Sequence, residues 1–168
     1  MTDRPARHRY IVALGSNVRH SVHGPPRAVL AAALDRLARR FRLLAASPVI
    51  VSAPLGPSRR RYANGAALVA ADIPPPAMLA ALQDMERAFG RRRRGQRWGA
   101  RVLDLDLVLW SGGAFTAPGL VVPHRAFRGR PFVTGPAAAV APAWRDPVTG
   151  LTLRQLDARL TRPRPLPS

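Results

Sequence analysis

The sequence contains no lysine and no cysteine, and only nine of its 168 residues are acidic. Without cysteine, the chain can form no disulfide, no thiolate zinc site and no cysteine nucleophile. Without lysine, it cannot carry the Gly-x-x-x-x-Gly-Lys-Ser/Thr loop of P-loop enzymes. Aromatic residues are also few, with five Phe, three Trp and two Tyr. This composition does not favour an open sheet covered with base-stacking aromatic side chains.

Long hydrophobic segments are absent as well. No run of 18 uncharged apolar residues occurs, so we expect no transmembrane helix and no membrane partner. The first ten residues carry positive charge but no apolar stretch of signal-peptide length, and we expect a cytoplasmic protein. A length of 168 residues and an apolar fraction of 47% predict one folded domain, which we expect at residues 9–160 with flexible tails at 1–8 and 161–168.

All 27 basic residues are arginine, and the formal net charge is +18. Such a charge is compatible with nucleic-acid binding. However, a chain selected for phosphate contacts alone would be expected to use lysine too. The abundant Ala, Pro and Gly indicate GC-rich codon usage instead. We therefore favour compositional bias combined with a local phosphate-binding site, and we keep an arginine-rich RNA-binding module as the alternative.

The hydrophobic pattern predicts alternating strands and helices. Apolar runs predict strands at 10–14, 43–51, 66–71 and 103–110, the second and third forming a hairpin. Helical spacing and proline-marked starts predict helices over 24–41, 72–90, 131–141 and 153–160. The resulting β-α-β-β-α-β order predicts an α+β, ferredoxin-like core, an antiparallel sheet covered by helices, with C-terminal additions.

Asp104 and Asp106 lie within one apolar strand and are separated by one residue. Residues i and i+2 of a strand share a face, so the two carboxylates project together while the neighbouring leucines face the core. Their mutual repulsion would be relieved by a divalent cation. Oxygen ligands beside arginines favour magnesium with a polyphosphate over zinc. A solvated strand face balanced by Arg97 or Arg101 is the competing interpretation.

The segment before these carboxylates is strongly basic. Six arginines occur among residues 91–101, together with two glycines. Guanidinium groups bind phosphate oxygens in a bidentate manner, so a mobile phosphate-gathering loop is predicted.

His124 also follows an apolar strand near other arginines and could donate to a phosphate. Together these residues favour a nucleoside triphosphate with magnesium, and a generic magnesium-dependent phosphoryl or nucleotidyl transferase remains an alternative.

Residues 97–107, Arg-Trp-Gly-Ala-Arg-Val-Leu-Asp-Leu-Asp-Leu, resemble the signature of the 6-hydroxymethyl-7,8-dihydropterin pyrophosphokinase family of folate biosynthesis. Shorter matches at 13–17, 54–57, 62–64 and 122–124 follow in the family's order. The resemblance covers roughly residues 9–160. It implies an enzyme, expected to be a monomer, that transfers pyrophosphate from ATP to the pterin's hydroxymethyl group and releases AMP.

The resemblance also implies roles for individual residues. Asp104 and Asp106 would bind two magnesium ions and, with Arg91 and Arg101, would form the catalytic group. Residues implied to contact ATP are Gln83, Arg91, Arg93, Trp98, Arg101, His124 and Arg130. Residues implied to contact the pterin are Ser52, Pro54, Leu55, Tyr62, Asn64, Trp98 and Phe132. Tyr62 and Phe132 would sandwich the flat ring while Asn64 reads its edge, which suits the chemistry of a heterocycle.

Overall fold

The computed structural model describes residues 6–52, 61–90, 101–163 and 165. The strands are β1 (His8–Ser16), β2 (Arg42–Ala46), β3 (Ile50–Ser52), β4 (Tyr62–Ala71), β5 (Asp104–Trp110), β6 (Phe115–Ala117) and β7 (Leu120–Val122). The helices are α1 (Pro26–Arg40), α2 (Pro75–Ala88), α3 (Pro131–Val140) and α4 (Leu153–Thr161), with a 3-10 turn at Phe127–Gly129. None of these helices combines the length and apolarity needed to cross a membrane.

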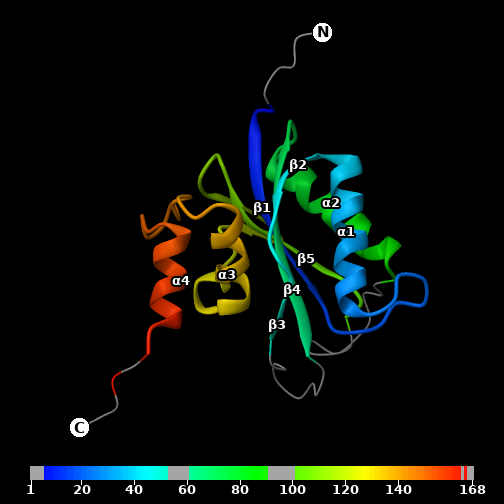
Figure 1. Cartoon of the computed structure of the whole chain (residues 1–168). Helices are drawn as coiled ribbons and strands as arrows, with labels where there is room; N and C mark the ends of the chain where they lie inside the picture. The colour runs from blue at the N-terminus through cyan, green and yellow to red at the C-terminus, as the bar shows by residue number, and fades with distance from the viewer. Residues whose placement is uncertain (1–5, 53–60, 91–100, 164, 166–168) are drawn as a thin grey trace.

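An antiparallel sheet forms the centre of this mixed α/β fold (Figure 1). Its strand order is β2-β4-β1-β5, and β3 also pairs with β4. β1 therefore lies between β4 and β5, with all nine of its residues paired to β4. β6 and β7 form a separate hairpin. The central position of β1 places residues of β4 and β5 on either side of the same short segment.

Helices cover both faces of the sheet. α1 and α2 lie on one face, and α3 and α4 lie on the other (Figure 1). Because side chains alternate along a strand, Tyr10, Val12 and Leu14 of β1 pack toward α1 and α2. Ile11 and Ala13 pack toward α3 and α4. β1 is consequently buried on both faces, which explains its nearly continuous apolar sequence.

The amphipathic helices form where the sequence predicts them. α1 and α2 each begin with proline, which suits the first helical turn because its missing N–H would have no intrahelical partner. The buried face of α1 carries Val29, Leu30, Ala33 and Leu37 at helical spacing. The predicted helices at 131–141 and 153–160 correspond to α3 and α4.

The predicted single strand over 43–51 is wrong, because the structure divides it into β2 and β3. Pro48 has no N–H to donate to a ladder. The buried Ser47 instead uses its Oγ to accept a hydrogen bond of 2.8 Å from the Ala66 N–H. The third strand also begins earlier than the predicted residue 66, since β4 starts at Tyr62. Tyr62 and Asn64 therefore lie within the sheet.

Candidate active site

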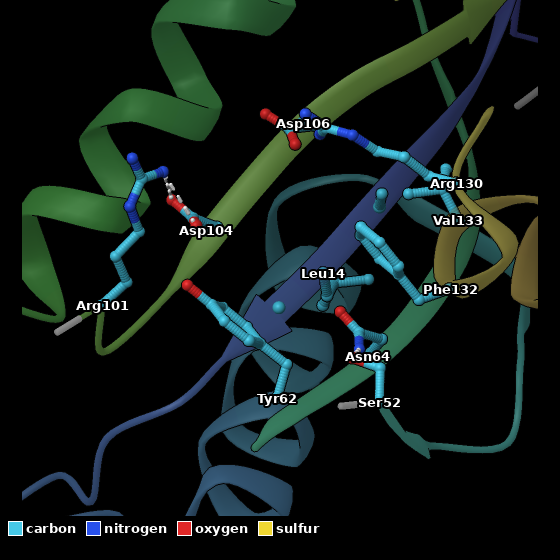
Figure 2. Close-up of a pocket in the computed structure, with 12 residues that line it drawn as sticks. Leu14, Ser52, Tyr62, Asn64, Arg101, Asp104, Asp106, Arg130, Phe132 and Val133 are labelled. Atoms are coloured by element: carbon cyan, nitrogen blue, oxygen red, sulfur yellow. Dashed lines mark hydrogen bonds and ion pairs between the residues drawn. The ribbon is translucent and has the colours of Figure 1, made fainter. Parts of the chain in front are cut away.

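A pocket of about 190 Å³ opens on the α3 side of the sheet (Figure 2). Its walls come from β1, β3, β4, β5 and the start of α3, together with Arg101 just before β5. The lining residues are Ala13, Leu14, Gly15, Ser52, Tyr62, Asn64, Arg101, Asp104, Asp106, Arg130, Phe132 and Val133. The fold thus gathers segments that are far apart in the sequence.

Strand register sets the two sides of this pocket. Gly15 of β1 lies opposite Asn64 of β4 and opposite Asp104 of β5. Neighbouring strands lie about 4.8 Å apart, so the amide and the carboxylate flank one glycine. A Cβ on Gly15 would lie 3.4 Å from the Asn64 Oδ1. The absence of a side chain at Gly15 leaves room between the amide side and the acidic side.

The predicted alternation in β5 is present in the structure. Leu105 and Leu107 are buried in the core, whereas Asp104 and Asp106 both line the pocket. The Arg101 guanidinium donates to both carboxylate oxygens of Asp104, at 3.1 and 3.0 Å. Burial acts to lower the pKa of Arg101, but the charge of Asp104 and this hydrogen bonding raise it above its ordinary value. Arg101 therefore remains cationic beside the acidic pair.

The opposite side of the pocket presents rings and an amide. Asn64 is only 5% exposed, and its Nδ2 donates to the Ser52 Oγ at 2.7 Å. This bond fixes the orientation of the amide. Burial, followed by the charge of Asp104, raises the pKa of the Tyr62 hydroxyl, although Arg101 opposes this shift. Tyr62 therefore keeps its proton at neutral pH and can donate a hydrogen bond.

The start of α3 closes the remaining side. Phe132 and Val133 in its first turn line the pocket, together with Arg130 immediately before the helix. The Arg130 guanidinium lies 5.9 Å from the centre of the Phe132 ring. The N-terminal end of a helix carries partial positive charge. This corner of the pocket therefore combines an aromatic surface with a preference for anions.

Two buried polar residues support the acidic pair, although neither was predicted to belong to the site. The Glu86 carboxylate on α2 accepts a hydrogen bond of 2.8 Å from the Leu105 N–H. Asn17 donates its N–H to the Arg101 carbonyl at 3.0 Å, and its Oδ1 accepts from the Arg101 N–H at 2.7 Å. A sequence signal existed for Glu86, since an acidic residue falls among the apolar positions of the buried face of α2.

Two described residues that the family resemblance implies for the site do not line this pocket. Gln83 and His124 are described but are not among the residues that line this pocket. The His124 Nδ1 accepts from the Ala126 N–H at 3.2 Å, so in the neutral ring Nε2 carries the proton and can donate. The residues that lie outside the described part of the chain are Pro54, Leu55, Arg91, Arg93 and Trp98.

The acidic pair suits magnesium by its donor chemistry. The described residues contain no group of three or more His, Cys, Asp and Glu side chains placed to hold an ion. Zinc sites ordinarily need three or four protein ligands. Magnesium is commonly held by one or two carboxylates, with substrate phosphates and water completing its shell. Asp104 and Asp106 fit that second pattern.

A carboxylate pair with neighbouring cations and an aromatic-walled pocket is typical of enzymes that transfer phosphate groups with magnesium. Residues 11–142 match the model of the 7,8-dihydro-6-hydroxymethylpterin-pyrophosphokinase (HPPK) family. The chain belongs to this family. The match favours neither the RNA-binding alternative nor a generic phosphoryl or nucleotidyl transferase.

Individual relatives agree with the family match. The chain is 42% identical over 142 residues to a 2-amino-4-hydroxy-6-hydroxymethyldihydropteridine pyrophosphokinase of Pseudomonas aeruginosa, covering 83% of this chain and 84% of the relative. It is 35% identical to a Synechocystis protein of the same name, covering 92% and 78%. A Plasmodium falciparum HPPK-DHPS crystal structure shares the fold, with a TM-score of 0.71 at 12% identity. That alignment covers 94% of this chain and 46% of the Plasmodium chain, so this chain spans about half of its length.

Proposed function

We propose that this chain transfers pyrophosphate from ATP to the hydroxymethyl group of 6-hydroxymethyl-7,8-dihydropterin, forming the pterin diphosphate and AMP in folate biosynthesis. Family membership supports the reaction. The structural observation that carries the proposal is the register at Gly15, which places Asn64 and Asp104 on either side of one residue. A ring held near the amide would thus have its substituent close to the acidic pair.

The core is further proposed to be ferredoxin-like. The order β1-α1-β2-β4-α2-β5 follows the β-α-β-β-α-β pattern of that class. The sheet order β2-β4-β1-β5, with β1 and β4 in the centre, supports the assignment. On this view β3, the β6–β7 hairpin, α3 and α4 are additions to the core. Of these additions, β3 and α3 contribute Ser52 and Phe132 to the pocket.

Recognition of the pterin is proposed to use Ser52, Tyr62, Asn64 and Phe132. The Asn64 amide can donate and accept at the edge of a heterocycle, and its bond to Ser52 holds it in one orientation. Tyr62 and Phe132 come from different elements and offer aromatic faces to the ring. By resemblance, Pro54, Leu55 and Trp98 complete this part of the site.

Asp104 and Asp106 are proposed to hold two magnesium ions along the ATP triphosphate. When bound, magnesium would stabilise negative charge on the phosphate oxygens and lower the pKa of a coordinated hydroxyl. Arg101 and Arg130 would bind phosphate oxygens, since both already line the pocket. By resemblance, the remaining ATP contacts would come from Gln83, Arg91, Arg93, Trp98 and His124.

The chemical step is an in-line displacement. A bond forms between the pterin hydroxymethyl oxygen and the β-phosphorus of ATP. The bond from that phosphorus to the oxygen that bridges it to the α-phosphorus breaks, and AMP leaves with this oxygen. The hydroxyl proton passes to solvent. The chain's residues orient the two substrates and offset the developing charge with arginines. We assign no protein side chain as general base.

Substrate analogues test the proposal. AMP formation should require the hydroxyl group, because its oxygen is the nucleophile. The pterin that carries 6-methyl in place of 6-hydroxymethyl keeps the ring but cannot react, so it should yield no AMP above the level with ATP alone. Equal AMP release with both pterins would indicate ATP hydrolysis and would contradict the proposal. Monomeric state and cytoplasmic location remain predictions.

A further inference from the structure

A second pocket, here called the distal pocket, lies on the same face of the sheet as the active site but at the other end of β1. Its volume is about 530 Å³, and its lining includes Arg9, Leu68, Val140, Trp144 and Arg145. Arg9 and Gly15 are six residues apart along β1, which corresponds to about 20 Å. The two pockets share no lining residue. The distal pocket is therefore separate from the proposed catalytic site.

The distal pocket combines an apolar floor with two cations. Leu68 and Trp144 pack on the hydrophobic cluster beneath α3 and α4, and both remain partly exposed. The Arg9 guanidinium carbon lies 5.6 Å from the centre of the Trp144 ring. Arg145 follows Trp144 in the sequence, and its Nη1 donates to the Gly150 carbonyl at 2.8 Å. The pocket lining thus includes two arginines and a partly exposed indole.

Arg9 has a fixed backbone but a side chain suited to a ligand. Its N–H donates to the Ser111 Oγ at 2.9 Å, and its carbonyl accepts from the Ser111 N–H at 2.9 Å. Among the residues that the structure describes, neither Arg9 nor Arg145 forms an ion pair with a carboxylate. Both arginines are exposed residues that line the distal pocket. Their charges are available to an anion from solution.

We propose that the distal pocket binds a small molecule that joins a flat aromatic ring to an anionic group, either a carboxylate or a phosphate. The ring would lie on the Trp144 indole and the apolar floor. The anion would accept charge-assisted hydrogen bonds from Arg9 and Arg145, whose planar groups match both carboxylate and phosphate. A concave, mostly apolar site with a few placed polar groups is the usual form of a small-molecule site. The proposal does not depend on the pyrophosphokinase reaction.

Titration with three probes of one ring system tests this proposal. The probes are 2-naphthoate, 2-naphthyl phosphate and neutral 2-naphthamide, and inorganic phosphate serves as the ring-free anion. Binding is followed by the NMR signal of the Trp144 indole N–H, assigned by comparison with Trp144→Phe. We expect a saturable shift with at least one naphthyl anion, at about tenfold tighter affinity than with the amide or inorganic phosphate. The tighter of the two anions identifies the carboxylate or phosphate preference.

Paired charge variants locate the binding. Arg9→Gln/Arg145→Gln should lower the affinity for the naphthyl anion by about tenfold or more, because charge-assisted hydrogen bonds are lost. Arg154→Gln/Arg159→Gln removes the same charge from exposed positions of α4 and should bind as the unaltered chain does. Phe132→Ala, in the active site, should also leave this affinity unchanged. The proposal is wrong if the Trp144 signal does not move with either anion, if the amide binds equally well, or if both charge variants lose affinity alike. The measurement on the unaltered chain decides the question even if a variant fails to fold.

Discussion

The Glu86 carboxylate accepts a hydrogen bond of 2.8 Å from the backbone N–H of Leu105, the residue between Asp104 and Asp106. β5 is at the edge of the five-stranded sheet and pairs only with β1 among the described strands. The Leu105 N–H is buried and has no neighbouring strand to bond. Glu86 supplies the missing acceptor from α2. This contact ties the position of the acidic pair to a helix on the opposite face of the sheet.

Replacing Glu86 should affect both stability and catalysis. Glu86→Ala leaves the Leu105 N–H buried without an acceptor, which should lower the free energy of unfolding by about 1–3 kcal/mol. It should also lower kcat, because the strand that carries both carboxylates loses a support. Glu86→Gln keeps an oxygen acceptor and should restore most of the stability. Urea denaturation and steady-state kinetics measure these effects, and an Ala variant with unchanged stability would contradict the positioning role.

Replacing either pocket carboxylate should abolish transfer without unfolding the chain. Asp104→Asn and Asp106→Asn keep nearly the same shape but remove a carboxylate that the proposed magnesium site needs. We expect turnover to fall more than about 1000-fold, as loss of metal-assisted charge stabilisation implies. Asp84→Asn, at an exposed position of α2, is the matched control and should keep full activity. Near-normal turnover with magnesium in an Asp104→Ala/Asp106→Ala double variant would show that the metal assignment is wrong.

Removing one aromatic wall of the pocket should weaken binding of the pterin but not binding of the nucleotide. Phe132→Ala deletes a ring that lines the pocket at the start of α3. Loss of its stacking and buried area should weaken pterin binding by about tenfold. Calorimetry should find the affinity for a non-hydrolysable ATP analogue with magnesium unchanged, which serves as the internal control. Unaltered pterin affinity would contradict the sandwich of Tyr62 and Phe132.

Stability in acid should depend on Asp146, which supports the 3-10 turn before α3. Burial acts to raise its pKa, but hydrogen bonds from Arg128, Thr149 and the Val148 N–H outweigh this and lower it to about 2 from the ordinary 3.8. Arg128 binds both carboxylate oxygens, at 2.6 and 2.7 Å. A pKa that is lower in the folded state gives stability that is present above the unfolded value and lost as pH falls toward the folded value.

This contribution should amount to about 2 kcal/mol and disappear between about pH 4 and pH 2. Urea denaturation across this range should therefore show a steeper loss of stability in the unaltered chain than in Asp146→Asn. Asp35→Asn, at an exposed position of α1, is the control and should follow the unaltered chain. The assignment fails if Asp146→Asn shows the same pH dependence as the unaltered chain.

The sequence predicts elements best where their pattern is local. The apolar spacing of Val29, Leu30, Ala33 and Leu37 predicts α1, and the alternation of β5 predicts that its two carboxylates share a face. Pro48 is a local signal for the break between β2 and β3, but the bond of the Ser47 hydroxyl to the distant Ala66 is not visible in the sequence pattern. The apolar strand predicted before His124 corresponds to β7, but β6 and its pairing with β7 are missed, since a strand of three residues carries too little pattern.

The sequence pattern likewise predicts the local features of the candidate site but not its long-range contacts. The acidic pair follows from two positions in one strand, whereas the Asn17–Arg101 contact joins residues 84 positions apart. The approach of Phe132 to Asn64 depends on α3 packing against the face opposite α1, which local periodicity does not specify. The family resemblance implied that Asn64 and Phe132 contact the pterin, and both residues line one pocket.

Mass spectrometry of a reaction containing ATP, magnesium and 6-hydroxymethyl-7,8-dihydropterin tests directly whether the chain transfers pyrophosphate. We expect the pterin diphosphate and AMP in equal amounts with the unaltered chain. With Asp104→Asn/Asp106→Asn, we expect neither product above background. Formation of ADP with a pterin monophosphate, or no pterin product from a folded chain, would contradict pyrophosphate transfer.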